Sequence, residues 1–400
     1  MGVLTEWLEL GVRWVHVIAG VAWIGTSFYF NWLNDRLEPA ASAEGGEVGE
    51  LWSVHGGAFY RAVKYDRVPR ATLDRLHWFK WEAYLTWLSG FALLALVYYL
   101  GAEVYLVEAG SAISPGLAVA VGIGALAVGW IVYDRLCRSP LAARPAWFAA
   151  VGLSLVALAA FGLDRVFGGR AAYIHVGAML GSIMAFNVFA VIIPAHVELV
   201  RGVEEQRRPD PTIGAHAAMR SRHNNYLTLP VIFAMISNHY PSAYGHAWGW
   251  LLLVGLFVVG VITRHGFNLR NQGLGRRAGW WFPAAGLGLL ALAIVSTGTR
   301  GGEALRADAP GGAVSWARAQ EILVARCVTC HAEEPAHRLF DAPPGGIRLE
   351  TSEQVRGLIS RIRAVTVESR VMPLGNVTGM TEEERAVLAA WIEQGAPTEP

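Results

Sequence analysis

The feature that most constrains this chain is a series of apolar runs, each about 20 residues long, that recurs before residue 300. As an α-helix, a run of that length spans the hydrocarbon core of a lipid bilayer. Charged residues make up 16% of the 400-residue chain, whereas average soluble domains contain about 25%. We count eight candidate membrane helices, of which the sixth is the shortest and most polar: residues 8–33, 79–101, 114–134, 146–164, 171–196, 224–241, 246–264 and 279–298.

The basic residues alternate between the predicted loops, as the positive-inside rule requires of a membrane protein. The arrangement places both termini outside the cell and the basic loops in the cytoplasm. Met1–Gly11 lacks a basic region and a small-residue cleavage site, so no cleavable signal peptide is expected. The net charge of +1 says nothing about partners, because the charges are distributed by loop; the expected partners are a lipid bilayer, a small-molecule substrate and electron carriers, with no nucleic acid. The basic loops, after the first, third, fifth and seventh helices, contain Arg36, Arg61, Lys64, Arg67, Arg70 and Arg75; Arg135, Arg138 and Arg144; Arg201, Arg207, Arg208, Arg220 and Arg222; and Arg264, Arg270, Arg276 and Arg277.

Cys327-Val328-Thr329-Cys330-His331 has the form C-x-x-C-H, which is typical of covalent c-type haem attachment. Cys327 and Cys330 would form thioethers to the haem, and His331 would be one axial ligand of the iron. The alternatives are a zinc half-site and a redox C-x-x-C. Zinc would require a second pair of ligands, but the remaining cysteine, Cys137, lies far upstream. A thioredoxin-like motif would require a βαβ pattern, which is absent. We therefore predict haem c.

The second axial ligand of the iron is predicted to be Met372, which precedes Pro373; Met380 and His337 are the alternatives. A thioether opposite histidine raises the haem potential and favours electron transfer.

Residues 315–400 are predicted to form a small, mostly helical cytochrome c domain. A first helix, Trp316–Arg326, leads to Cys327. A second begins with Thr381 as its N-cap and Glu384 completing a capping box, and it ends at Gly395. Leu388 and Trp391 in this helix would cover one haem edge.

These features predict an all-α chain with a membrane bundle in residues 1–298, a flexible linker in 299–314 and the cytochrome in 315–400. In bacteria, c-type haem is attached on the outer side of the inner membrane. The predicted topology places the cytochrome and both termini on that periplasmic side.

Several histidines lie in the apolar runs, where ionisable residues are functional candidates. His16 and His175 occur in similar stretches, 15–19 and 174–178, and residues 84–86 resemble 226–228. These matches suggest a 4+4 internal repeat, although short matches also arise by chance. Histidines on facing helices commonly hold b-type haem, so we hypothesise haem b at His16, His175 or His239. The alternative is hydrogen-bonded histidines without a cofactor. His77, His196, His223 and His265 lie near the inner helix ends.

Two clusters at the inner side suggest a substrate site, because aromatic rings, amides and a cation suit a flat, anionic, nitrogen-rich ligand. The alternative is an aromatic belt with snorkelling Lys and Arg, which explains two consecutive asparagines poorly. The clusters are His77-Trp78-Phe79-Lys80-Trp81-Glu82 and Arg222-His223-Asn224-Asn225-Tyr226, and the loop adds Trp52, His55, Gly56, Gly57, Phe59 and Tyr60.

At these residues the chain resembles the bacterial membrane-bound urate oxidases, also called urate hydroxylases, which join an eight-helix membrane domain to a C-terminal cytochrome c. The resemblance covers nearly the whole chain, and its membrane-domain motifs are specific, whereas C-x-x-C-H is common to many cytochromes. His196 departs from the expected pattern, so it is given no family role. The matching stretches are residues 14–20, 23–25, 49–52, 55–57, 77–84, 174–178, 223–230 and 237–241.

The resemblance implies oxidation of urate, or a related purine, to 5-hydroxyisourate in purine degradation. Electrons would pass through haem c to a cytochrome c pool and a terminal oxidase, not directly to oxygen. As hypotheses, His223 or Glu82 is the base, Arg222 or Lys80 holds the anion, and Asn224 and Asn225 contact the purine edge.

Two other functions are compatible with the residues. The first is a membrane electron-transfer subunit without its own substrate, served by quinol or a partner dehydrogenase. The second is a transporter or sensor gated by the cytochrome.

Overall fold

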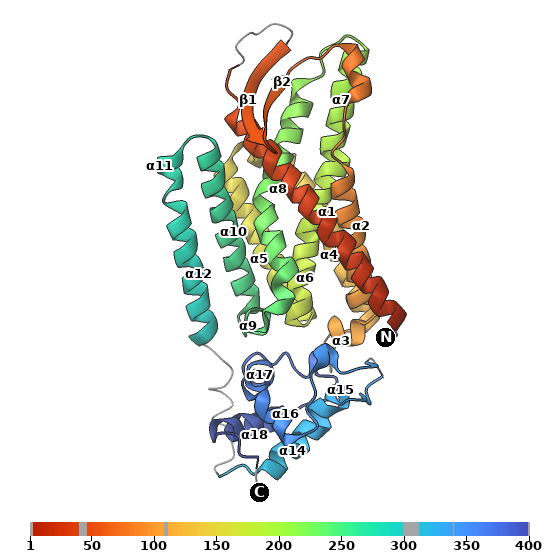
Figure 1. The fold of residues 1–400 in the computed structure, drawn as a ribbon, viewed down its shortest axis with the longest axis vertical. Helices are drawn as coiled ribbons and strands as arrows, with labels where there is room; N and C mark the ends of the chain where they lie inside the picture. Colours follow the sequence, from red (N-terminus) through yellow and green to blue (C-terminus); the bar gives the residue numbers. More distant parts are fainter. Residues whose placement is uncertain (1–2, 40–45, 108–110, 299–311, 339, 399–400) are drawn as a thin grey trace.

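The computed structural model describes residues 3–39, 46–107, 111–298, 312–338 and 340–398. Long helices lie side by side in a bundle, and a smaller helical unit covers one end of it (Figure 1). The first helix begins at this same end (Figure 1).

Seven of the described helical segments are long and apolar enough to cross a membrane, which confirms the predicted all-α polytopic bundle. Pro115 and Pro145 begin two of these helices at the first position, where the missing N–H is not needed. The helices of the bundle are α1 (Val3–Arg36), α2 (Trp81–Leu93) continuing as η3 (Leu94–Tyr99), α3 (Ala102–Tyr105), α4 (Pro115–Cys137), α5 (Pro145–Val166), α6 (Gly169–Asn187) continuing through η5 (Val188–Ile192) into α7 (Ile193–Glu204), α8 (Pro211–Ile236), η6 (Ser237–His239), α9 (Pro241–Tyr244), α10 (Gly249–Asn271), α11 (Gly275–Ala278) and α12 (Trp281–Gly298).

Helix α8 differs from the predicted sixth helix, 224–241. It begins at Pro211, where the Asp210 side chain caps it, and ends at Ile236. Arg220 and Arg222, which we assigned to a loop, therefore lie in the helix, and Arg264 likewise lies inside α10. α8 is not among the seven apolar spans. It packs against α6 and α10, whose side chains pair with its polar groups.

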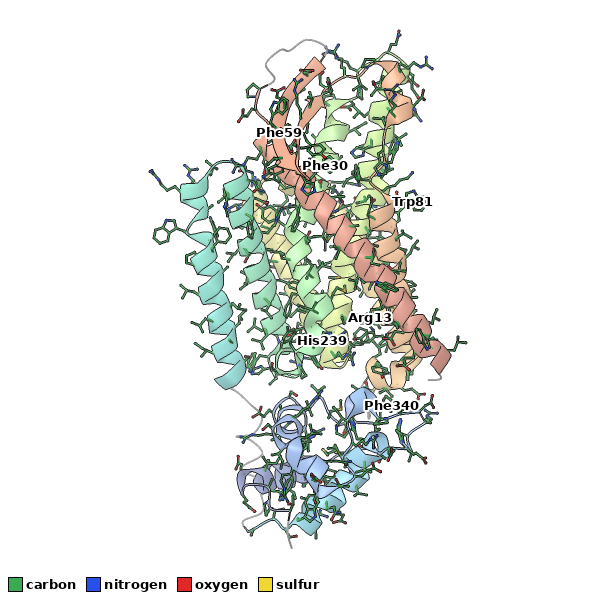
Figure 2. All side chains as sticks on the ribbon, viewed as in Figure 1. Arg13, Phe30, Phe59, Trp81, His239 and Phe340 are labelled. Atoms are coloured by element: carbon green, nitrogen blue, oxygen red, sulfur yellow. The ribbon has the colours of Figure 1, made fainter. Side chains whose placement is uncertain are left out.

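The segment after α1, predicted as a loop, contains an antiparallel hairpin of β1 (Glu47–His55) and β2 (Ala58–Tyr65). Gly56 and Gly57 form its turn, and both have positive φ, which glycine adopts without strain and tight hairpin turns require. The hairpin stands at the end of the bundle opposite the C-terminal unit, where Phe59 is exposed (Figure 2).

The core of the bundle is centred on α6, which is buried along most of its length. It packs against α4, α5 and α8. The outer helices instead expose large apolar side chains, such as Trp14 and Ile18 on α1 and Leu290 and Ile294 on α12. In water such a surface would be unfavourable, but it suits the hydrocarbon core of a bilayer.

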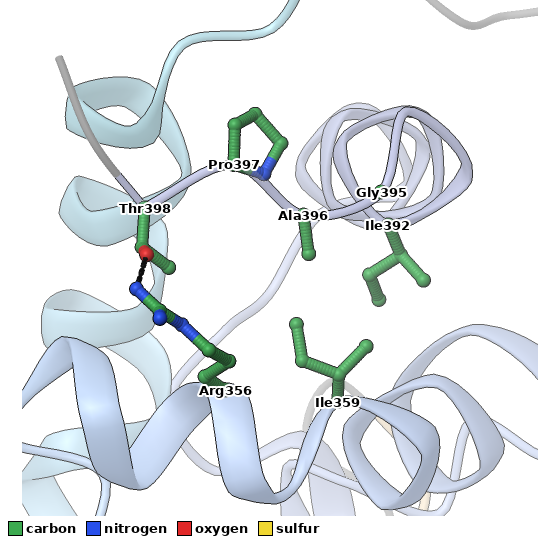
Figure 3. Close-up of a pocket in the computed structure, with 7 residues that line it drawn as sticks. All are labelled: Arg356, Ile359, Ile392, Gly395, Ala396, Pro397 and Thr398. Atoms are coloured by element: carbon green, nitrogen blue, oxygen red, sulfur yellow. Dashed lines mark hydrogen bonds between the residues drawn. The ribbon is translucent and has the colours of Figure 1, made fainter.

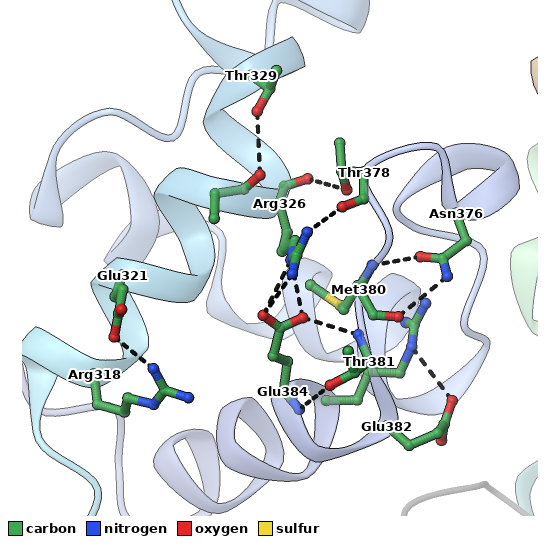
Figure 4. A network of polar contacts seen from close by, with 12 residues as sticks. Arg318, Glu321, Arg326, Thr329, Asn376, Thr378, Met380, Thr381, Glu382 and Glu384 are labelled. Carbon is green, nitrogen blue, oxygen red and sulfur yellow. Dashed lines mark hydrogen bonds and ion pairs between the residues drawn. The ribbon is translucent and has the colours of Figure 1, made fainter. Parts of the chain in front are cut away.

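The C-terminal unit has its own core. Its two predicted helices are observed as α14 (Trp316–Leu323) and α18 (Glu382–Glu393), and the predicted capping box of Thr381 and Glu384 is confirmed. Arg326 donates to Glu384 and to the Thr378 carbonyl, which ties the end of the first helix to the start of the last (Figure 4). Between these helices lie η7 (Val324–Val328), α15 (Thr329–His331), α16 (Ser352–Gly357), α17 (Ile359–Ile362), η9 (Arg363–Glu368) and η10 (Leu374–Asn376).

The C-terminal unit contacts the bundle closely. A Cβ atom at Gly245 would lie 2.4 Å from the Ser369 carbonyl oxygen, and one at Gly375 would lie 2.7 Å from that of Val104. Val371 packs against the core of the bundle. Most of the predicted linker, 299–314, falls in residues 299–311, outside the described residues.

Candidate functional site

The C-x-x-C-H segment spans η7 and α15. The His331 Nδ1 atom lies 3.0 Å from the Ile347 carbonyl oxygen. A hydrogen bond there fixes the tautomer and leaves Nε2 for iron. Burial, together with the charge of the neighbouring Cys330, raises the pKa of the Cys327 thiol to about 12. The orientation of His331 is compatible with haem c, which stays a prediction.

Met372 and Met380 have different surroundings. Met372 is half-buried, and its backbone carbonyl accepts a hydrogen bond from the buried Arg385 guanidinium at 2.8 Å. Met380 is 3% exposed and belongs to the core, and Asn376 holds its backbone on both sides. Met372 as the second axial ligand stays a prediction. His337 packs beside Phe340.

Leu388 and Trp391, which we expected at a haem edge, are fully buried in the core of the unit. Trp391 lies against Trp316, and its indole N–H donates to the Pro397 carbonyl. A cavity of about 520 Å³ opens nearby, and none of the predicted haem residues lines it (Figure 3). Its lining residues are Arg356, Ile359, Ile392, Gly395, Ala396, Pro397 and Thr398.

The three histidines considered for haem b have different surroundings, and haem b stays a hypothesis. His16 contacts the Thr86 carbonyl and Ser89 of α2. His175 is fully buried, its Nδ1 contacts the Ala171 carbonyl, and its Nε2 has no hydrogen-bond partner among the described residues. His239 lies at the bundle end nearest the C-terminal unit (Figure 2). No hydrogen bond or ring contact between described residues joins any two of the three.

Consecutive residues of α8 contact different helices. The His223 Nδ1 lies 2.9 Å from the Tyr133 hydroxyl of α4, and its ring stacks on Phe148 of α5. Asn224 donates to the Met184 carbonyl of α6 and accepts from Asn187. The side chains of His223, Asn224 and Asn225, which we predicted to form one group, therefore contact different helices.

Arg220 completes the polar cluster on this face of α8. It is 1% exposed, pairs with Asp134 at 2.6 Å and donates to Asn187 at 3.2 Å. Its guanidinium also lies 5.0 Å from the centre of the Tyr133 ring. The ion pair of Arg220 with Asp134, which Asp134 shares with Arg138, links α8 to α4.

Asn225 faces the other way, toward α10. Its Oδ1 accepts from Arg264 Nε and from Asn268 Nδ2, each at 2.9 Å. The Arg264 guanidinium lies 3.7 Å from the centre of the Phe28 ring of α1. All three polar side chains are buried.

The other predicted site residues lie apart from this group. Lys80 lies over the rings of Trp78 and Trp81, as a snorkelling lysine in an aromatic belt would. Glu82 is half-buried in the first turn of α2, which packs against α1 and α6. Arg222 is exposed. The hairpin residues Trp52 and Phe59 are 63% and 83% exposed.

Sequence reasoning missed Arg220, Arg264, Asn187, Asp134 and Asn268 as partners of the predicted asparagines. Arg220 and Arg264 were counted as loop residues because they adjoin the ends of the apolar runs. Their signal is their spacing: Arg264 and Asn268 are four residues apart, and therefore on one face of a helix.

The comparisons with known proteins agree with the sequence resemblance over the bundle. The family model described as urate oxidase N-terminal matches residues 2–297. No curated protein and no solved structure matched this chain. The family match covers every helix of the bundle, including all the buried polar residues of α8 and α10. The chain therefore belongs to the urate oxidase N-terminal family.

Proposed function

We propose that this protein oxidises urate to 5-hydroxyisourate at the membrane and passes the electrons through a C-terminal haem c to a respiratory cytochrome pool. The family match of the bundle supports urate as the substrate. The C-x-x-C-H segment, with His331 Nδ1 directed to the Ile347 carbonyl, supports the haem. The location is the bacterial inner membrane, with the cytochrome on the periplasmic side.

The reaction balances as urate plus water giving 5-hydroxyisourate, two protons and two electrons. When bound, a haem c supplies a one-electron acceptor, so each urate requires two successive transfers. Cys327, Cys330 and His331 would hold the haem, with Met372 as the second ligand. Asn225 and the arginine that it contacts hold the anion. A nearby base takes the protons, and His223 and Glu82 remain the hypotheses for that base.

The observation that carries this proposal is the contact between the C-terminal unit and the bundle. The segment that contains Met372 lies against the bundle through its neighbours Val371 and Gly375. On the other side, Arg338, which follows the C-x-x-C-H segment, pairs with Glu103 of α3 at 2.6 Å. These contacts support electron transfer between the C-terminal unit and the membrane domain within one chain.

A site near the hairpin end would be separated from the haem by roughly 30 Å of hydrocarbon. A second redox centre is therefore part of the proposal, and His175 is the histidine that fits it best. Its Nε2 atom is buried and lacks a partner. A Cβ atom at Gly122 would lie 2.8 Å from that nitrogen, so a larger residue would cover it.

The test is anaerobic mixing of the oxidised, purified protein with urate. We expect the α-band of reduced haem c to rise as urate absorbance falls, with two haem equivalents reduced per urate. Ascorbate serves as the control that the haem is reducible. Haem that ascorbate reduces but urate does not would contradict the proposal, and reduction by quinol would then favour the electron-transfer subunit. A pyridine haemochrome spectrum with haem c alone would exclude haem b.

A further inference from the structure

Two side chains that hydrogen-bond each other between α8 and α10 each keep a buried donor without an acceptor among the described residues. Asn225 Nδ2 and Arg264 Nη2 have no hydrogen-bond partner among the described residues. Asn225 is 1% exposed and Arg264 is 5% exposed. Leaving such donors buried and unpaired costs on the order of 1–3 kcal/mol each, and more for a charged group. A fold that keeps both is therefore expected to satisfy them with a ligand.

The orientation of the Asn225 amide is determined by its neighbours. Its Oδ1 atom accepts from both Arg264 and Asn268. Rotating the amide by 180° would place its NH₂ group against two donors and lose both hydrogen bonds. The unpaired Nδ2 and the unpaired guanidinium nitrogen therefore belong to the same pair of hydrogen-bonded side chains, and both donate.

The charge around these donors favours an anion. Asp35 interacts electrostatically with Arg222 as well as with Arg264, so one carboxylate serves two guanidinium groups. Arg220 differs because it makes a direct ion pair, with Asp134 at 2.6 Å, although Arg138 shares that carboxylate and the Arg220 Nε also lacks a partner among the described residues. Arg264 instead has an aromatic partner, Phe28, against its guanidinium plane. Arginine presents a planar fork that matches planar acceptors.

We infer that Arg264 and Asn225 form the anion-binding part of the substrate site, and that they hold a planar heterocyclic anion with carbonyl acceptors, of which urate is the example. This inference rests on the proposed function for the identity of the anion. Asn268 orients Asn225, and Phe28 limits the guanidinium to one plane. The site draws on α1, α8 and α10, so it forms only when the bundle is assembled.

The test measures binding without turnover. The full-length protein is reduced with dithionite, so that it cannot accept electrons, and binding of radiolabelled urate is followed by equilibrium dialysis. Asn225→Asp keeps the oxygen that accepts from Arg264 and Asn268 but removes the Nδ2 donor and adds a negative charge. We expect urate affinity to fall roughly 10- to 150-fold, the range for losing a hydrogen bond to a charged group. Arg264→Gln should have an effect of similar size.

The matched control is Asn34→Asp, which makes the same charge change at an exposed position where Lys64 donates to the side chain at 2.6 Å. It should bind urate as the wild type does. Haem c content and thermal unfolding verify that each variant is folded. Wild-type affinity in folded Asn225→Asp would overturn the site while leaving the proposed function standing. A wild-type protein that neither binds nor oxidises urate would overturn both.

Discussion

Met372 and Met380 allow a test of haem ligation at the scale of single residues. Met372→Ala should remove the thioether-to-iron absorption band and lower the haem potential, because a thioether ligand opposite histidine raises it. Met380→Leu is the matched control: Met380 belongs to the core, and a volume-conserving swap costs less than about 1.5 kcal/mol. Near-infrared absorption of both variants would detect the band, and redox titration would measure the haem potential. Loss of the band in Met380→Leu alone would reverse the assignment.

The sequence predicts the function of a single residue where the residue type and its spacing determine the chemistry. Cys327, Cys330 and His331 are predicted from their spacing, and Asn225 from the two consecutive asparagines in an apolar run; these site assignments stay predictions. Arg264 could not be chosen in this way, because an arginine near the end of an apolar run is usually a loop or interfacial residue. Its role depends on contacts with Phe28 and Asn225, which come from two other helices.

At the scale of elements, Gly245 at the end of α9 tests the docking of the C-terminal unit. Its φ is ordinary, −88°, so alanine introduces no backbone strain there. The added Cβ would meet Ser369 and Val371. Overpacking of about 1–3 kcal/mol would lower the docked population roughly 5- to 150-fold. We therefore expect Gly245→Ala to slow haem reduction by urate and to leave reduction by ascorbate unchanged in stopped-flow measurements.

The control for Gly245→Ala is Gly116→Ala in the first turn of α4, where an added Cβ meets nothing within 4 Å. In this variant, urate should reduce haem c at the wild-type rate. Equal rates in both variants would indicate that docking does not limit electron transfer.

Elements were predicted well where the apolar pattern is continuous and poorly where polar contacts determine the structure. The seven apolar spans follow from run length. Helix α8 begins 13 residues before its predicted start, at Pro211 rather than residue 224. Side chains of neighbouring helices hydrogen-bond its Arg220, Asn224 and Asn225. The hairpin was missed although Gly56-Gly57 between two runs rich in Val, Trp, Phe and Tyr is a recognised turn signal.

At the scale of the whole molecule, the two ends of the bundle should face opposite sides of the membrane. The hairpin and α11 lie at one end, and the C-terminal unit lies at the other (Figure 1). Basic residues concentrate in the connections at the hairpin end, including Arg276 and Arg277 of α11. The positive-inside rule then places the hairpin in the cytoplasm and the C-terminal unit outside.

Cysteine labelling of spheroplasts measures this topology. Native Cys137 is buried, so it gives little background, and Cys327 and Cys330 are consumed if haem is attached. We expect Glu353→Cys, on α16, to react with a membrane-impermeant maleimide in intact spheroplasts. Ala58→Cys and Arg276→Cys should react only after detergent treatment, because both positions are exposed at the hairpin end. The opposite labelling pattern would place the C-x-x-C-H segment in the cytoplasm, where haem c is not attached, and would therefore contradict the proposed electron route together with the topology.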